Sequence, residues 1–283
     1  MTTRTDIALL FPGQGSQTPD MRDDVARELP DLLDRCIELV GEDPFARVDE
    51  STRFAQPAIF CASMAGWHKS DGEPSMAAGH SLGELGALTA AGVLGTDDAL
   101  ELVVLRGKLM AEADDSGSML ALLGGTIEDA EAIAGQAGVT VANDNAPGQV
   151  VLSGSVEDLD KTEAIANERQ TRVIRLDVAG AFHSPAMAPA AEPFRAALDK
   201  VEIHDAAFPV YSCASAAPFT DVRAELAAAL TSPVRWRETM LAMHADGAQR
   251  FVEVGPGKVL ARLGKRILPD CKVETPAEEL AHA

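Results

Sequence analysis

Residues 79–83 read GHSLG and match the G-x-S-x-G pattern of a nucleophile elbow, a sharp turn between a strand and a helix. A short apolar run precedes them and a helical pattern follows, which is the context such a turn requires. The glycines leave space in a strained bend, so that the Ser81 hydroxyl is held out at the end of the sheet. The next amide, that of Leu82, lies at a helix N-terminus and is a candidate oxyanion donor. The pattern predicts a serine nucleophile, with a non-catalytic glycine-rich turn as the alternative.

His183 is the candidate general base among six histidines. It stands in a loop that is expected to return the chain from an inserted unit to a larger domain, and functional side chains are often found on such loops. His80 adjoins Ser81, but at a sharp turn its side chain is expected to point the other way. The others lie among charged or polar neighbours or in the C-terminal tail: His68, His204, His244 and His282. A hydrogen-bonded structural histidine is the alternative for His183.

The order of these residues along the chain argues against a standard esterase. An α/β-hydrolase has its histidine near the C-terminus, after an acidic triad member, whereas roughly 100 residues follow His183 here.

A glycine-rich loop and a lone arginine complete the candidate chemistry. The loop FPGQGSQ at residues 11–17 lacks the lysine of a P-loop and the G-x-G-x-x-G spacing, so nucleotide binding is disfavoured. Its glycines let the Gln14 backbone approach a reacting group, which makes the Gln14 amide a candidate second oxyanion donor. Arg106 stands in an otherwise apolar helical segment and needs a carboxylate partner or a water-filled cleft. A substrate carboxylate would satisfy it; an ordinary surface or ion-paired arginine is the alternative.

The hydrophobic pattern predicts the elements that position these residues. Residues 7–11 form an apolar run typical of a strand buried on both faces, and residues 76–79 suit a central strand. Helical patterns cover residues 19–40, 55–68, 83–92, 96–113, 185–200, 221–230 and 236–246, and further strands are expected at 208–213 and 250–255. Strands that alternate with helices indicate an α/β fold with a parallel-sheet core. The acidic tail beyond Pro269 is expected to be weakly ordered.

An inserted unit interrupts this pattern between about residues 117 and 180. Its segments follow the order βαββαβ, which is that of a ferredoxin-like subdomain. The last strand is expected at residues 171–178. We therefore expect residues 1–116 and 181–283 to form the large α/β domain and residues 117–180 to form the small subdomain.

Composition excludes several classes of protein. The chain has 283 residues, of which 46% are hydrophobic and 24% charged, as in ordinary globular proteins. The net charge of −20 disfavours nucleic-acid and anionic-membrane surfaces. Four widely spaced cysteines indicate neither a zinc site nor a disulfide framework, and no apolar stretch approaches a signal or membrane segment. We therefore expect a cytoplasmic protein with no nucleic-acid or membrane partner.

Seven motifs in one order resemble those of the malonyl-CoA:acyl carrier protein transacylase family, which includes the acyltransferase domains of fatty-acid and polyketide synthases. They are FPGQGSQ (11–17), GHSLGE (79–84), LRGKLM (105–110), NDNAPGQVVLSG (143–154), GAFHSPAM (180–187), SPVRW (232–236) and VEVGPGKVL (252–260). The resemblance implies a large domain with a hydrolase-like core, a ferredoxin-like insertion and an active site in the cleft between them.

The resemblance also implies roles for single residues. By matching positions, Ser81 is the nucleophile, His183 the general base, Gln14 and Leu82 the oxyanion donors, and Arg106 the bidentate ligand of a malonyl carboxylate. A backbone carbonyl at or near Ala229 is expected to orient the histidine. Phe182, Met110 and Asn145 are expected to bind substrate, and Phe182 to disfavour an α-methyl branch. Cys213 stands where asparagine is common in relatives.

The implied reaction is a ping-pong transfer of malonyl from malonyl-CoA to the phosphopantetheine thiol of a holo acyl carrier protein, without metal or redox cofactor. Carrier proteins are acidic, so a local basic patch is needed, for which Arg169, Arg172 and Arg175 are the candidates. We expect a monomer. The alternatives are the acyltransferase subunit of a malonate decarboxylase, an acyltransferase acting in trans for a polyketide synthase, a thioesterase-like hydrolase, and a non-catalytic docking protein.

Overall fold

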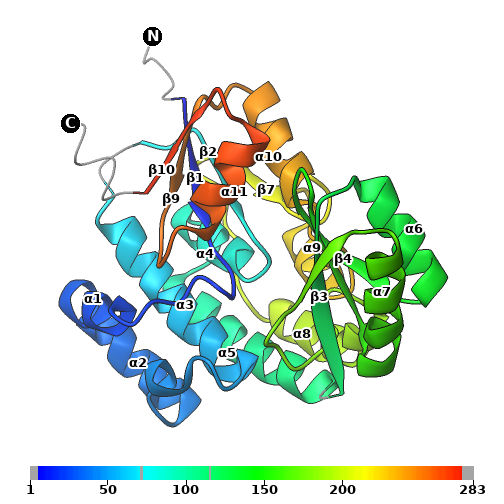
Figure 1. Cartoon of the computed structure of the whole chain (residues 1–283). Coiled ribbons are helices and arrows are strands. Elements are labelled where there is room, and N and C mark those ends of the chain that lie inside the picture. Colours follow the sequence, from blue (N-terminus) through cyan, green and yellow to red (C-terminus); the bar gives the residue numbers. More distant parts are fainter. Residues whose placement is uncertain (1–5, 71–72, 115, 276–283) are drawn as a thin grey trace.

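Two β-sheets organise the computed structural model, which describes residues 6–70, 73–114 and 116–275 (Figure 1). The larger sheet has six strands in the order β10-β9-β1-β2-β7-β8, all neighbours parallel except β7 and β8. Their bounds are β1 Ile7–Phe11, β2 Met76–Gly79, β7 Val210–Ser212, β8 Ala217–Pro218, β9 Arg250–Glu253 and β10 Lys272–Glu274.

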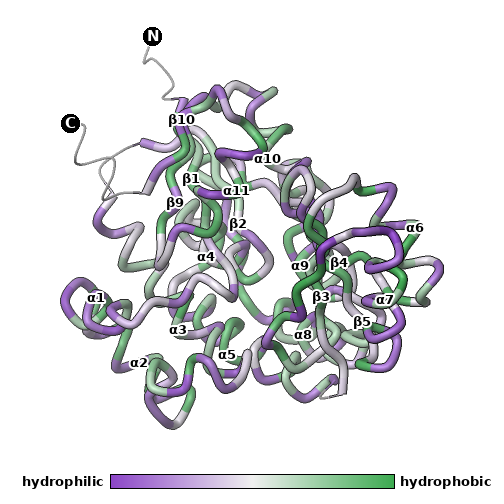
Figure 2. The backbone as a smooth tube through the Cα atoms, in the orientation of Figure 1, coloured by the Kyte–Doolittle hydropathy of each residue, from purple (hydrophilic) through white to green (hydrophobic). Residues whose placement is uncertain are grey.

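The central strands are buried on both faces, as their apolar runs predict. Leu9 and Phe11 of β1 pack into one core, which holds the helices α3 (Thr52–His68), α4 (Gly83–Ala90) and α5 (Thr96–Ala113). Ala8 and Leu10 face the opposite core, which holds residues of α10 (Trp236–Ala245) and α11 (Val259–Ile267). Figure 2 shows the hydrophobic residues gathered on these strands and on the inner sides of the helices. The parallel-sheet α/β core is therefore confirmed.

One predicted helix is divided in two. The helix expected over residues 19–40 consists of α1 (Met21–Glu28) and α2 (Pro30–Val40), with Leu29 between them at φ −140°. Proline disfavours helical backbone in the residue before it, so the chain bends at Leu29. The other elements of this part are α8 (Ala188–Leu198), α9 (Val222–Ala228) and the short 3₁₀ helices η1 (Pro44–Arg47) and η2 (Pro185–Met187).

The second sheet has four antiparallel strands in the order β4-β5-β3-β6. Their bounds are β3 Gly117–Leu123, β4 Thr140–Ala146, β5 Gln149–Ser155 and β6 Arg172–Arg175, with α6 (Ile127–Ala137) and α7 (Val156–Glu168) packed against them. This is the ferredoxin-like arrangement that the βαββαβ order predicts. The strand β6 is shorter than the predicted 171–178. The exact division of the chain at residues 117 and 180 stays a prediction.

The expectation of a weakly ordered tail is wrong for its first part. Lys272–Glu274 forms β10, which pairs in parallel with β9. Val273 is buried in the core, and Glu274 pairs with Arg250 at 2.7 Å and with Lys272 at 2.9 Å. One buried apolar residue and these ion pairs therefore anchor a segment whose composition alone suggests disorder. The rest of the tail, with His282, lies outside the described residues.

None of the helices in the described part of the chain is long and apolar enough to cross a membrane.

Candidate active site

Ser81 lies in the turn between β2 and α4 with a left-handed backbone at φ 53°, an uncommon conformation for a residue other than glycine. Glycines on both sides make this turn sterically allowed. A Cβ added to Gly79 would lie 1.9 Å from the Gly83 carbonyl carbon, and one added to Gly83 would lie 2.0 Å from the Phe11 oxygen. The structure therefore shows a strained strand–turn–helix bend with Ser81 at its apex.

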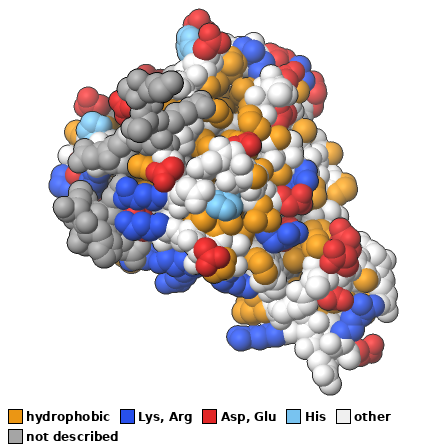
Figure 3. All heavy atoms as spheres, turned by 90° about the horizontal axis from the view of Figure 1, so that it is seen from above, with side chains coloured by type: hydrophobic (Ala, Val, Ile, Leu, Met, Phe, Trp, Pro, Cys, Tyr) orange, Lys and Arg blue, Asp and Glu red, His pale blue; other side chains and the backbone are white. Residues whose placement is uncertain are grey.

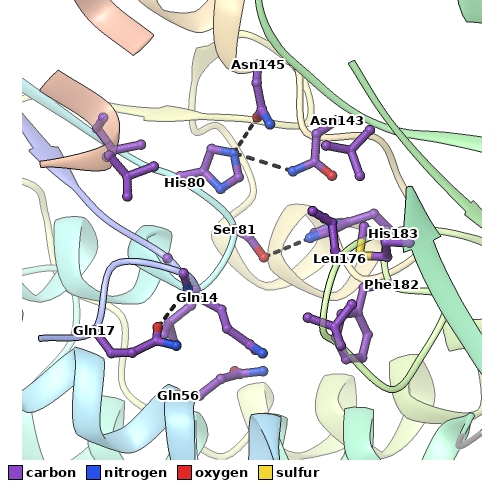
Figure 4. Close-up of a pocket in the computed structure, with 18 of the residues that line it drawn as sticks. Gln14, Gln17, Gln56, His80, Ser81, Asn143, Asn145, Leu176, Phe182 and His183 are labelled. Atoms are coloured by element: carbon purple, nitrogen blue, oxygen red, sulfur yellow. Dashed lines mark hydrogen bonds between the residues drawn. The ribbon is translucent and has the colours of Figure 1, made fainter. Parts of the chain in front are cut away.

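His183 lies directly across from Ser81 (Figure 4). Its Nε2 is 2.8 Å from the Ser81 Oγ, while its Nδ1 is 3.0 Å from the Ala229 carbonyl oxygen and 3.1 Å from that of Ser232. Because carbonyl oxygens only accept hydrogen bonds, Nδ1 carries the proton and Nε2 presents its lone pair to the serine hydroxyl. The predicted carbonyl contact at Ala229 is present. His183 also has a left-handed backbone, at φ 56°.

The surroundings of His183 keep its imidazole neutral. Burial lowers its pKa to about 3, and the positive charge of Arg106 acts in the same direction. The ring is therefore in the form that accepts a proton.

Arg106 reaches the same serine from α5 although its side chain is buried. Its Nη2 donates to the Ser81 Oγ at 3.1 Å and its Nη1 to the Gln56 Oε1 at 2.8 Å. Gln56 is itself held by the Thr52 hydroxyl at 2.9 Å and the Met110 sulfur at 3.3 Å. Burial lowers the pKa of Arg106 to about 10, opposed by the negative charge of Glu84, so the guanidinium is still protonated at neutral pH. A buried cation with two neutral partners is a ready site for a carboxylate.

Glu84 lies one helical turn after Ser81 and is almost fully buried. Its Oε1 accepts the Cys213 amide hydrogen at 2.8 Å, which ties α4 to the end of β7 behind the nucleophile. Burial raises the pKa of Glu84 to about 7, against hydrogen bonds from Cys213 that lower it. At Cys213, the polar contact near the site is thus made by the backbone amide.

The two predicted oxyanion donors come from different segments beside the nucleophile. Leu82 precedes the first residue of α4, where amides lack an intrahelical acceptor. Gln14 lies in the loop after β1, which approaches so closely that a Cβ on Gly13 would lie 2.6 Å from the His80 oxygen. Both residues line the same cavity as Ser81.

This cavity has a volume of about 330 Å³ and is lined by residues of the large-sheet part and of the four-stranded sheet. The large sheet and its helices contribute Gln14, Ser81, Leu82 and Arg106, among others. Apolar residues of the four-stranded sheet, Met119 and Val151, face them. The structure also places the predicted substrate residues Met110, Asn145 and Phe182 in its lining.

Asn145 has a partner that the sequence did not suggest. Its Oδ1 is 2.8 Å from the His80 Nε2, and the Asn143 side chain approaches the same nitrogen at 3.4 Å. His80 thus points toward the β4 asparagines, as Figure 4 shows, yet it lines the same cavity as Ser81.

Sequence reasoning missed four residues of the site: Gln56, His80, Glu84 and Asn143. The signal that singled out Arg106, a polar residue within an apolar helical segment, applies equally to Gln56 in α3 and Glu84 in α4.

The structure does not gather on one face the three arginines predicted to form one basic patch, and their role in carrier docking stays a prediction. Arg175 pairs with Asp160 at 2.6 Å and Glu163 at 3.5 Å, and Arg169 donates to the Gln136 Oε1 at 3.0 Å. Arg172 and Arg175 are three residues apart on β6, and successive side chains of a strand alternate, so they lie on opposite faces. The spacing could not predict the ion pairs of Arg175, because it says nothing of the acids on α7.

Within the part of the chain that the structure describes, no cluster of three or more His, Cys, Asp or Glu side chains could hold a metal ion.

Comparison with known proteins identifies the family of this chain. The family model for the acyl transferase domain matches residues 9–281. A malonyl CoA-acyl carrier protein transacylase of Bacillus subtilis is 38% identical, over 92% of this chain and 90% of the relative. A polyketide biosynthesis malonyl CoA-acyl carrier protein transacylase of Bacillus velezensis is 35% identical, over 92% of this chain and 96% of the relative.

Solved structures match at the level of the whole fold. The crystal structure of a malonyl-CoA:acyl carrier protein transacylase from Xanthomonas oryzae is similar with a TM-score of 0.91 and 33% identity, covering 100% of this chain and 98% of that one. An acyl carrier protein S-malonyltransferase from Vibrio cholerae gives a TM-score of 0.88 at 33% identity, over 96% of each chain. With the serine, histidine and arginine meeting in one cavity and a family match over nearly its whole length, this chain belongs to the acyl transferase family.

Proposed function

We propose that this protein transfers malonyl from malonyl-CoA to the phosphopantetheine thiol of a holo acyl carrier protein through a malonyl-Ser81 intermediate. The observation that carries the proposal is the Ser81 Oγ, which lies between a neutral imidazole at 2.8 Å and a buried guanidinium at 3.1 Å. The first arrangement makes a nucleophile, and the second selects an acyl group that ends in a carboxylate.

Acylation begins when the His183 Nε2 takes the proton of the Ser81 hydroxyl. The Oγ attacks the thioester carbonyl carbon, and the resulting oxyanion accepts hydrogen bonds from the Leu82 and Gln14 amides. The carbon–sulfur bond then breaks and His183 returns the proton to the sulfur of CoA. During this step the imidazolium is stabilised by the Ala229 and Ser232 carbonyl oxygens, which accept from Nδ1.

Arg106 is the proposed ligand of the malonyl carboxylate. In the free protein the Arg106 Nη2 donates a hydrogen bond to the Ser81 Oγ. A bound carboxylate would replace that neutral partner by a charged one, while Gln56 continues to hold the other side of the guanidinium. The acyl carbonyl is thereby positioned at the oxyanion donors.

Deacylation repeats these steps with the carrier thiol as the nucleophile. His183 takes the thiol proton, the sulfur attacks malonyl-Ser81, and His183 protonates the leaving Ser81 Oγ. Water must be kept from the acyl-serine, and the apolar lining by Met119, Val151 and Phe182 supports this role. Each step is an acyl or proton transfer, so no metal or redox cofactor is required by the chemistry.

The wider assignments belong to the same proposal. The division into residues 1–116 with 181–283 and residues 117–180 is supported by the cavity, which both parts line. The four cysteines are free thiols, which supports a cytoplasmic location. We also propose that the protein acts as a monomer without nucleic-acid or membrane partners.

The test is intact-mass spectrometry of the protein after exposure to malonyl-CoA. A malonyl adduct that forms on the wild type, is absent from Ser81→Ala and is discharged by a holo carrier protein is the expected result. An adduct that only hydrolyses would indicate a thioesterase. Because the Bacillus velezensis relative is named for polyketide biosynthesis, carriers of both fatty-acid and polyketide type should be offered.

A further inference from the structure

An ion pair joins the four-stranded sheet to the large-sheet part of the chain at β4 and α10, which pack together. The Arg237 Nε and Nη2 of α10 donate to the Asp144 Oδ2 of β4 at 2.8 Å and 2.7 Å. The Asp144 side chain is only 8% exposed, and that of Arg237 is 28% exposed. Neither residue lines the cavity of Ser81, yet Asp144 lies between Asn143 and Asn145, which do. The pair therefore adjoins the wall of the cavity without being part of it.

Backbone hydrogen bonds join the same two parts beside the ion pair. The Val234 amide donates to the Ala142 carbonyl oxygen at 2.8 Å, and the Asp144 amide donates to the Val234 carbonyl oxygen at 2.9 Å. These bonds make a parallel bridge on the edge of β4 opposite β5. On the β5 side, the pairing shifts register both before Asn143 and after Asp144. Because such irregularities locally disrupt the ladder, this part of β4 depends more on its contacts with residues 232–237.

The same segment, residues 232–237, also contacts both histidines of the site. The Ser232 carbonyl oxygen accepts from the His183 Nδ1 at 3.1 Å. The centroid of the Trp236 ring lies 5.5 Å from that of the His80 ring. From the β4 side, the Asn145 Oδ1 lies 2.8 Å from the His80 Nε2, as Figure 4 shows. The placement of β4 against this segment therefore affects the surroundings of His80 and, through Ser232, the orientation of the base.

The burial of Asp144 sets this pair apart from the ion pairs on the surface. Figure 3 shows Lys and Arg side chains beside Asp and Glu at several places on one face of the molecule. Exposed pairs of that kind contribute little, because water surrounds both charges. In a buried pair, desolvation offsets much of the attraction, so the pair is weak evidence for added stability. The main effect of the Asp144–Arg237 pair is therefore geometric: two guanidinium donors on one carboxylate oxygen fix how β4 lies against α10.

We propose that Asp144 and Arg237 are positioning residues that keep the His183 imidazole aligned for acyl transfer. This inference rests on the proposed function. The ion pair fixes β4 against α10, and the backbone bridge beside it carries that placement to the Ser232 carbonyl oxygen. Once the pair is lost, this oxygen can move away from the Nδ1 proton. A shift of about 1 Å in a catalytic group can cost about 100-fold in rate.

The test is a double-mutant cycle in the full-length protein, with Asp144→Asn, Arg237→Gln and both changes together. Single-turnover acylation of Ser81 is followed by mass spectrometry over a range of malonyl-CoA concentrations. Each single variant is expected to lower the maximal rate about 10-fold. The malonyl-CoA concentration for half the maximal rate should change less than about twofold, because Arg106 and the cavity lining are intact. The double variant should also lose about 10-fold, not about 100-fold, because the two residues act through one contact.

A second readout does not require activity. The His183 Nδ1 proton is hydrogen-bonded to two carbonyl oxygens, so it is expected as a low-field signal in the proton NMR spectrum. The loss of this signal in His183→Gln assigns it. Its chemical shift should change in both single variants. Arg237→Lys keeps the charge but not the two parallel donors, and should change the rate and the signal less than Arg237→Gln.

Asp144→Asn keeps the proposal testable if Arg237→Gln fails to fold. Arg237→Gln leaves a nearly buried carboxylate without its cation, whereas in Asp144→Asn the remaining guanidinium is partly exposed to water. The matched control is Arg195→Gln, which removes an exposed ion pair with Asp199 at 3.2 Å within α8. The control should change neither the acylation rate nor the NMR signal.

Three results would overturn the proposal. The first is a maximal rate for Asp144→Asn within about twofold of the wild type, or an unmoved NMR signal in that variant. The second is a loss that appears in the half-saturating concentration instead of the maximal rate. The third is losses that multiply in the double variant, since the two residues would then act independently. Should the wild type not be acylated at all, the proposed function fails, and the NMR signal still decides whether the pair positions the histidine.

Discussion

The Arg106 guanidinium donates to the Ser81 Oγ at 3.1 Å, the same oxygen that lies 2.8 Å from the His183 Nε2. One oxygen thus contacts both a base and a buried cation. Burial and, after it, the Arg106 cation lower the pKa of His183, which keeps the imidazole neutral. A carboxylate that binds Arg106 would screen the positive charge of the guanidinium. It would also replace the Ser81 Oγ as the acceptor of the Arg106 hydrogen bond.

Replacement of Arg106 by alanine should separate substrates by charge. Two charge-assisted hydrogen bonds to a carboxylate are worth about 3 kcal/mol together, so malonyl transfer should fall about 100-fold or more. Acetyl transfer, which uses no such contact, should fall much less. The measurement is kcat/KM for malonyl-CoA and acetyl-CoA. Arg106→Lys is the control, because lysine keeps the positive charge but cannot donate the two parallel hydrogen bonds of a guanidinium. Equal losses for the two substrates would contradict the assigned role.

Acylation of Ser81 should be insensitive to pH where an ordinary histidine titrates. Protonation of His183 removes the base, so the rate falls on the acid side of its pKa, which burial and Arg106 lower to about 3. Single-turnover acylation is therefore expected to stay level from about pH 8 down to about pH 5. In Arg106→Gln the cation is gone, and the acid limb should move toward higher pH. A wild-type limb near pH 6.5, with circular dichroism showing an intact fold, would refute this account.

Shortening Phe182 should weaken discrimination against a methyl branch. Its ring lines the cavity and packs against Gly180, where an added Cβ would lie 2.6 Å from the ring. One methyl group is worth about 1–3 kcal/mol in a tight pocket, so Phe182→Ser should raise the methylmalonyl-to-malonyl ratio of kcat/KM about 10-fold or more. Competition between the two CoA esters measures it. An unchanged ratio would show that the ring only fills the core.

Glu84 should make the protein less stable as the pH rises. Its pKa is about 7 in the folded protein against 4.5 for the free side chain. The folded state therefore holds a proton that the unfolded chain has lost between pH 4.5 and about 7, and stability falls across that window by about 3 kcal/mol. Glu84→Gln keeps an acceptor for the Cys213 amide and should lose this dependence.

Urea unfolding at pH 5 and pH 8 checks the Glu84 prediction, with Glu131→Gln on the exposed side of α6 as the control. Wild type and Glu84→Gln should differ in their pH dependence, whereas Glu131→Gln should follow the wild type. Identical slopes for all three would show that Glu84 does not carry the effect.

The sequence predicted the elements whose signals are local. The apolar run at Ile7–Phe11, the turn around Ser81 and the βαββαβ order of the small sheet each follow from neighbouring residues, and each is found in the structure. Composition failed at β10, because a three-residue strand is stabilised by pairing with β9 and burial of Val273, contacts that are distant in the chain.

For the site, residue types and motif order were enough to name Ser81, His183 and Arg106 as partners. Only the tertiary structure decided that their side chains meet at one oxygen, that Gln56 and Glu84 support them from α3 and α4, and that Arg175 is occupied by acids of α7. The physical reason is that hydrogen bonds and burial act over a few ångströms in space, and residues far apart in the chain come within that range only when the helices pack on the sheets.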